Sequence, residues 1–393
     1  MEKEWIHPKT ITGDAATAER YLRREYINEE FWREVQKGNH ILFVAPRRVG
    51  KTSLMKDLVI NCPEGYVCVY EDIEGVKTRN GFYQRIFELI LRCAHRSKFQ
   101  EAKVFIKRCT EKNSIKEIST SGIKIDENKI DYEREIRELI PQLKDAKVHA
   151  VIFLDEFAEV IYKFKGDQQQ DAVDILHTLR EIRHDDHFFH FTIVYAGSIG
   201  LESVIKNIDR PKLINDLHPI KLGALTDEEA ADLVKKVTRG TSIRLSAPVL
   251  IYLKRKVGYF LPYYLQLMIE SIDELAFKIA KPKVTVEMVD EAFQRILGER
   301  KNFDDWLERL KSYQRDHFPF INEILKHAAH EGNIPIQAVY DKAKKYDRTE
   351  DYMDFIDELI RDGYLTECDP HVYRFIAPFL KEFWKQKYPI YEK

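Results

Sequence analysis

Short apolar runs alternate with amphipathic stretches over the first 224 residues of the chain. Runs of this kind are typical of buried strands, and they occupy residues 41–44, 66–70, 148–154, 190–196 and 217–222. Between them, apolar positions at helical spacing predict helices over 15–37, most of 79–146 and 168–184. Strands that alternate with helices predict an α/β fold, with a parallel sheet covered by helices on both faces. A polar, lysine-rich stretch at residues 110–129 resembles an exposed, mobile insertion.

The pattern becomes purely helical after residue 225. Helices are predicted over residues 226–238, 247–256, 261–279 and 285–297, the first with a Thr226 cap and acidic residues in its first turn. Residues 301–393 contain helical patterns around 313–330, 335–345 and 349–362, then two strands that flank Asp369 and Pro370, and a last helix from Pro378. Three helices and a two-stranded wing predict a winged helix. The expected domains are therefore 1–224, 225–300 and 301–393.

Composition narrows the class of protein. A length of 393 residues suits two or three domains, and a formal charge of −2 gives no overall attraction to nucleic acid or to an anionic membrane. The five cysteines lack C-x-x-C spacing, which argues against a zinc site and against a disulfide framework and predicts reduced thiols. The charged start MEKEWIHPKT is unlike a signal peptide, and no run of 18 apolar residues occurs. We expect a soluble, cytoplasmic protein.

The sequence APRRVGKT at residues 45–52 lies between a predicted strand and the helical stretch SLMKDLVI. This is the setting of a phosphate-binding loop (P-loop), in which Gly50 permits close backbone approach, Lys51 covers the β- and γ-phosphates and Thr52 offers its hydroxyl to Mg²⁺. Ala45 stands where the pattern G-x-x-x-x-G-K-[ST] has its first glycine, a change that we interpret as tolerated. The predicted nucleotide-binding residues of the loop are Ala45, Pro46, Arg47, Arg48, Val49, Gly50, Lys51, Thr52 and Ser53.

A second motif, VHAVIFLDEF at residues 148–157, has the form of a Walker B strand. Asp155 is predicted to hold Mg²⁺, and Glu156 to orient or deprotonate the attacking water. Ser198 follows the next apolar strand, and two interpretations stay open: a catalytic sensor of the γ-phosphate, or an N-cap of the following helix. Pro262, in GYFLPYYLQ, is likewise either an ordinary helix start or a contact to the nucleotide phosphates.

The predicted third helix of the winged-helix domain is acidic, with the sequence TEDYMDFIDELIRD. Residues 301–393 contain fifteen Lys or Arg against eighteen Asp or Glu. Duplex DNA is bound mainly by cations that face its phosphates. The excess of acidic over basic residues in this domain therefore favours a protein contact or an intramolecular clamp over DNA binding.

Five segments of the sequence together resemble the archaeal-type P-loop ATPase family of the STAND/AAA+ group, which is related to origin-recognition-type ATPases. These segments are PRRVGKTSLM, LDEF, YAGSIGLE, GYFLPYYLQ and YRFIAPFLKEFW. The resemblance implies binding of ATP and Mg²⁺, slow hydrolysis to ADP, and a helical lid and winged helix that respond to the nucleotide. The residues of this sequence to which the resemblance assigns the family's functional roles are Lys51, Thr52, Asp155, Glu156, Ser198 and Pro262. The helix from residue 261 begins without Arg or Lys, so the AAA+ sensor-2 arginine is absent, which favours a switch over a motor.

Three hypotheses follow for the function. The first is an ATP-driven conformational switch that works through protein partners or self-association. The second is a DNA-binding initiator or loader that uses the winged helix, and the third is a nucleotide-binding scaffold with negligible turnover. A hydrolytic ring would need an arginine finger, for which Arg210 is a candidate; a surface arginine before Pro211 is the alternative interpretation.

We expect Lys51→Ala to abolish nucleotide binding, because the charge that covers the phosphates is removed. Glu156→Gln should retain binding and block turnover, because the group that activates water is lost. Fluorescent-nucleotide binding and phosphate release check both variants. Hydrolysis at the wild-type rate by Glu156→Gln would show that the assignment of Glu156 is wrong.

Overall fold

The computed structural model describes residues 4–17, 20–97, 100–113, 115–119, 122–125, 130–164, 166–197, 200–208, 210–299, 301–313 and 315–390. The chain divides into two compact units. Unit 1 comprises Met1–Leu22, Pro46–Gly50 and Gly223–Lys393, and unit 2 comprises Arg23–Ala45 and Lys51–Leu222. The division into three domains stays a prediction. Among the described residues, no helix is both long enough and apolar enough to cross a membrane.

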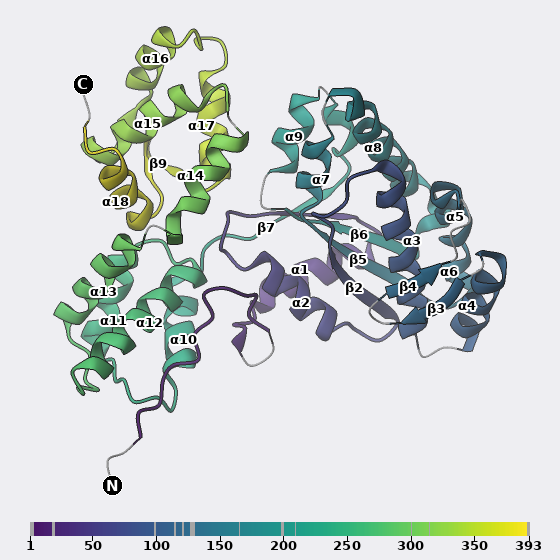
Figure 1. Ribbon diagram of the computed structural model, residues 1–393, viewed down its shortest axis with the longest axis horizontal. Helices are drawn as coiled ribbons and strands as arrows, with labels where there is room; N and C mark the ends of the chain where they lie inside the picture. The colour runs from purple at the N-terminus through teal and green to yellow at the C-terminus, as the bar shows by residue number, and fades with distance from the viewer. Residues whose placement is uncertain are drawn as a thin grey trace. The chain divides into compact units, whose positions relative to one another are not determined.

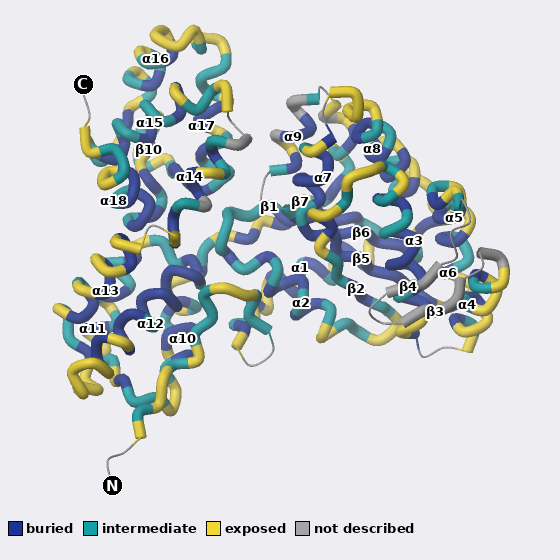
Figure 2. Tube along the Cα trace, viewed as in Figure 1, coloured by how far each residue is buried: buried dark blue, intermediate teal, exposed yellow. Residues whose placement is uncertain are grey.

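A five-stranded parallel sheet forms the centre of unit 2, in the order β2-β5-β6-β1-β7. All residues of β5 and β6 are buried, as Figure 2 shows in dark blue, because helices cover both faces. Strand β6 lies between β1 and β5, and Asp72 at the end of β2 pairs with Asp155 at the end of β5. The predicted parallel sheet is confirmed. Its strands are β1 (Ile41–Val44), β2 (Tyr66–Asp72), β5 (His149–Asp155), β6 (Phe191–Tyr195) and β7 (His218–Lys221).

The helices of unit 2 flank this sheet, with α1 and α2 to one side in Figure 1 and α3 and α8 to the other. Residues 110–129, predicted to be an insertion, include the antiparallel hairpin of β3 (Ile115–Ser119) and β4 (Gly122–Ile125). The remaining elements are α1 (Glu25–Gln36), α2 (Lys51–Ile60), α3 (Arg79–Arg96), α4 (Gln100–Asn113), α5 (Tyr132–Leu139), α6 (Gln142–Asp145), α7 (Phe157–Lys163), η2 (Gly166–Gln168), α8 (Gln169–His184), η3 (Asp186–Phe188), α9 (Leu201–Asn207) and η4 (Pro211–Leu213).

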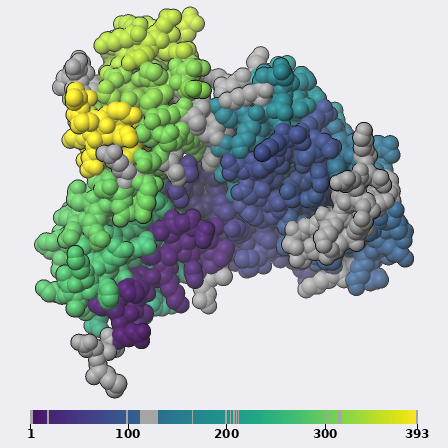
Figure 3. Space-filling model, viewed as in Figure 1, coloured from purple at the N-terminus to yellow at the C-terminus, as the bar shows by residue number. Residues whose placement is uncertain are grey.

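The first helix begins at Glu25 and not at residue 15 as predicted, and in the missed stretch the carbonyl of Tyr21 accepts the ammonium group of Lys236 at 2.7 Å. Residues nearer the start of the chain also have distant partners. The backbone N–H of Ile11 donates to Oε1 of Gln266 at 2.7 Å, and the indole of Trp5 donates to Asp273 at 3.0 Å. These contacts lie within unit 1, where the purple N-terminal residues meet the green helices in Figure 3. Those helices are α10 (Asp227–Thr238), α11 (Ala247–Val257), α12 (Pro262–Lys278) and α13 (Val286–Gly298). The Thr226 cap is confirmed as a capping box with Glu229.

The C-terminal part of unit 1 contains a three-stranded antiparallel sheet in the order β8-β10-β9. The helix predicted around residues 313–330 is wrong at its start, which is Phe318, and α14 was not predicted. Pro319 explains the start, since proline lacks an N–H and fits only the first turn. The elements are α14 (Lys301–Tyr313), α15 (Phe318–Glu331), β8 (Ile334–Pro335), α16 (Ile336–Lys345), α17 (Tyr352–Arg361), β9 (Leu365–Asp369), β10 (Val372–Phe375) and α18 (Pro378–Lys387).

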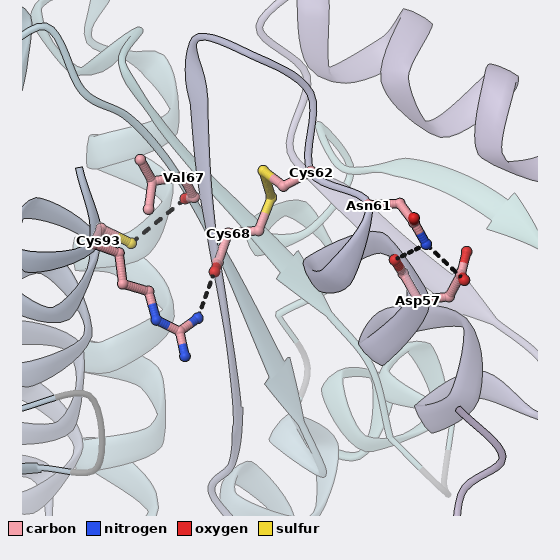
Figure 4. The surroundings of a disulfide bond; sticks show 7 residues. Asp57, Asn61, Cys62, Val67, Cys68 and Cys93 are labelled. Carbon is pink, nitrogen blue, oxygen red and sulfur yellow. Dashed lines mark hydrogen bonds between the residues drawn. A yellow bond between two sulfur atoms is a disulfide. The ribbon is translucent and has the colours of Figure 1, made fainter. Parts of the chain in front are cut away.

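A disulfide joins Cys62, just after α2, to Cys68 on β2, which corrects the expectation of reduced thiols throughout. The two Cα atoms lie 6.1 Å apart, a separation that a disulfide spans without backbone movement. Figure 4 shows Cys93 beside this bond, with its thiol directed to the carbonyl of Val67. Burial raises the pKa of Cys93 to about 12, so this thiol stays protonated. The disulfide therefore fastens the end of α2 to the strand beside it.

Replacing both Cys62 and Cys68 by serine should lower the free energy of unfolding by about 2 kcal/mol, because a short closed loop is released in the unfolded chain. Denaturant titration without reductant measures the change, with Cys368→Ser as the matched control. Equal stability of the double variant and the control would contradict the expectation.

His40, just before β1, links this strand to the middle of β6. Its Nδ1 accepts the backbone N–H of Ile193 at 3.0 Å, and its side chain is buried. Burial, and then the charge of Arg183, lower the pKa of His40 to about 3. A histidine that is neutral when folded and charged when unfolded makes stability fall as the pH decreases.

The stability of the folded state should therefore decrease between about pH 6.5 and pH 3 through His40. His40→Asn removes this titration. The free energy of unfolding of the variant should therefore change less steeply with pH than that of the wild type, by roughly 1.4 kcal/mol per pH unit, the contribution of about one proton. Urea unfolding at several pH values between 6.5 and 4 measures the slopes. Identical slopes for the variant and the wild type would overturn this assignment.

Candidate nucleotide site

Parallel strands end at one edge of a sheet. In unit 2, the strands that precede the predicted P-loop and that carry the predicted Walker B motif both end at this edge. β1 ends just before the loop of residues 45–52, and β5 ends at Asp155. In open α/β sheets, ligands bind at the carboxyl ends of the strands. The strand order therefore places the predicted phosphate and metal residues where such a fold binds its ligand.

Helix α2 begins at Lys51 and presents its N-terminus at this edge. The Lys51 ammonium group donates to the backbone carbonyl of Ala45 at 3.2 Å, and the residue is only 9% exposed. Ser53, the third residue of the helix, is also buried. Backbone N–H groups at a helix start and a nearby ammonium group form a site that attracts anions.

The Asp155 carboxylate is buried and accepts three hydrogen bonds. Its Oδ2 accepts the hydroxyl of Thr52 at 2.8 Å and the hydroxyl of Tyr70 at 3.0 Å. Its Oδ1 accepts the backbone N–H of Glu156 at 3.1 Å. Asp155 is only 4% exposed, and these donors compensate the cost of burying its charge.

Glu156 has a left-handed backbone, with a φ of 59°, at the N-cap position of α7. A non-glycine residue in this conformation is under local strain, which functional sites often hold. The next N–H, that of Phe157, donates to the carbonyl of Ala196 just after β6, at 2.9 Å. This bond fixes the turn from which the Glu156 side chain projects.

The middle of the predicted loop, Pro46–Gly50, groups with unit 1. There the guanidinium carbon of Arg48 lies 4.5 Å from the centre of the Tyr263 ring, next to Pro262 in the first turn of α12. Gly50 has a φ of +99°, a conformation that suits glycine, so its place in the motif has a backbone reason. Arg48, at a φ of 64°, also has a left-handed backbone.

Other predicted residues are placed differently. Ser198 lies outside the described residues. Arg210 is exposed between α9 and η4.

The donor set of unit 2 fits Mg²⁺, although no group of three or more His, Cys, Asp or Glu among the described residues could hold a metal ion. Mg²⁺ beside phosphates takes one or two protein oxygens, with waters and phosphates as its other ligands. Thr52 and Asp155 are hydrogen-bonded oxygens of this kind. A hydroxyl can bind a cation through a lone pair of its oxygen while its O–H group still donates to the carboxylate.

Comparisons with known proteins agree with this geometry. No protein-family model matches the chain, and no curated protein matches its sequence. A Walker-type ATPase of Pyrococcus abyssi superposes with a TM-score of 0.65 at 14% identity, over 95% of this chain and 98% of that one. The chain has the fold of a Walker-type ATPase. The ORC2 protein of Aeropyrum pernix, solved with ADPNP and ADP, matches with a TM-score of 0.52 at 12% identity, over 99% of this chain and 98% of that one.

The Walker-type fold confirms the predicted fold class, and it is the fold of the archaeal ATPases that the sequence resembles. Sequence analysis missed one residue of the site, Tyr70. It stands at the carboxyl end of a strand, before Glu71 and Asp72, but the sequence does not show that this strand neighbours the one with Asp155. The residue assignments themselves stay predictions.

Proposed function

We propose that this protein is a Mg²⁺-dependent ATPase that hydrolyses ATP slowly and acts as a nucleotide-driven switch. The observation that carries the proposal is the hydrogen bond from Thr52 to Asp155, which joins residues 103 positions apart at 2.8 Å. These residues belong to the two motifs that bind phosphate and metal in P-loop proteins. The Walker-type fold supports the same conclusion.

Each residue then has a distinct role. Lys51 and the α2 N-terminus bind the phosphate oxygens, and Thr52 and Asp155 hold Mg²⁺, which when bound supplies charge neutralisation. Glu156 orients a water molecule and accepts its proton. Ser198 and Pro262 are proposed as contacts that distinguish ATP from ADP.

The switch is proposed to act through other parts of the chain. We assign residues 1–224 to the ATPase core, 225–300 to the lid and 301–393 to a winged helix. Helix α12 begins without Arg or Lys, which supports a STAND-like switch rather than a ring motor. A protein partner, or a second copy of the chain, receives the signal.

DNA binding is the second candidate, and the charges of the C-terminal part do not favour it. On α17, Asp354 and Asp357 are exposed, as is Glu367 on β9. Carboxylates on this face would repel phosphates. A cytoplasmic location stays a prediction. Disulfides such as that between Cys62 and Cys68 are uncommon in reducing compartments, of which the cytoplasm is one.

The test is ATP turnover by the purified chain, beside Glu156→Gln, with and without duplex DNA, while light scattering follows the mass. We expect slow turnover that DNA does not change, a loss of turnover in the variant, and an ATP-dependent change in mass or shape. Turnover or assembly driven by DNA would favour the initiator hypothesis. Tight nucleotide retention without turnover would favour the scaffold.

A further inference from the structure

Tyr70 is the side chain of the site for which neither motif accounts. It lies on β2, where it pairs in register with Phe153 on β5, while Asp72 pairs with Asp155. Successive side chains of a strand alternate between the two faces of a sheet. Tyr70 and Asp155 therefore share a face, one pleat apart on neighbouring strands, and the Tyr70 hydroxyl reaches Oδ2 of Asp155 at 3.0 Å.

Helix α2 covers the same face. The Lys56 ammonium group lies 5.4 Å from the centre of the Tyr70 ring, and Lys56 is one helical turn after Thr52. Cys68, two residues before Tyr70 and therefore on the same face, is joined to Cys62 just after α2. Tyr70 is thus held between the strand and the helix that carries the phosphate-binding residues.

The hydroxyl of Tyr70 can act only as a donor to this carboxylate. A carboxylate oxygen accepts hydrogen bonds, so the phenol O–H of Tyr70 is the donor of this bond. Hydrogen bonds to a charged group are about twice as strong as those between neutral groups. With Thr52 on the same oxygen, Tyr70 limits the rotation of the carboxylate.

We propose that Tyr70 is a positioning residue for the metal site, whose hydroxyl fixes Asp155 Oδ2 so that Asp155 and Thr52 present their oxygens to Mg²⁺. The inference rests on the proposed function and deepens it. Hydrogen-bond partners of metal ligands orient those ligands, and their loss typically weakens metal affinity tenfold or more.

The test compares Tyr70→Phe with Tyr66→Phe. Tyr66 is the matched control, since it lies on the same strand and face, and its ring packs on His149 at 4.6 Å and on Trp32 at 5.3 Å, away from Asp155. The probe is mant-AMPPNP, a fluorescent ATP analogue that is not hydrolysed, titrated in EDTA and then with increasing Mg²⁺.

Tyr70→Phe should need roughly tenfold more Mg²⁺ than the wild type for half-maximal strengthening of nucleotide binding. Its affinity for the analogue in EDTA should be unchanged, and Tyr66→Phe should behave as the wild type in both conditions. Circular dichroism and a cooperative melt above the assay temperature establish that each variant is folded.

Two results would overturn the role of Tyr70 alone: the same Mg²⁺ requirement in both variants, or an equal loss of affinity with EDTA and with Mg²⁺, which indicates a damaged phosphate loop. A wild-type protein without Mg²⁺-dependent binding would overturn the proposed function, and this inference with it.

Discussion

The buried charge of Asp155 is the constraint on which the site depends. A carboxylate with so little exposure is tolerated only where donors surround it, and here they come from α2, from β2 and from the backbone of the following residue. Neither side-chain donor, Thr52 nor Tyr70, reaches Asp155 unless β2 pairs in register with β5 and α2 starts directly after the loop. The sheet order and the site therefore specify each other.

The parts of the fold that the sequence predicted are those with local signals. A strand buried on both faces is a continuous apolar run, so β5 and β6 were visible without any knowledge of their neighbours. The loop before α2 was visible because phosphate binding dictates its spacing. The α10 cap was visible because Thr226 and Glu229 bond to each other's backbone within one turn.

The parts that were missed depend on distant contacts. Tyr70 acquires its role only through the neighbour of its strand, which no local pattern encodes. The pairing of Cys62 with Cys68 depends on a separation in space that the turn between α2 and β2 creates. The start of α1 was placed too early because the residues before Glu25 have distant partners, as where the carbonyl of Tyr21 accepts the ammonium group of Lys236.

The contacts of the N-terminal segment also bear on how the chain folds during synthesis. Ile6 bonds to Ser242, Ile11 to Gln266 and Trp5 to Asp273, at sequence separations of 236, 255 and 268 residues. These residues are therefore synthesised well before the partners that they contact. Unit 2, whose segments lie between them, can pack earlier, because chains generally fold domain by domain as they emerge. Completion of unit 1 is then a late event, and a nascent chain that stalls before residue 242 leaves Trp5, Ile6 and Ile11 without these three partners.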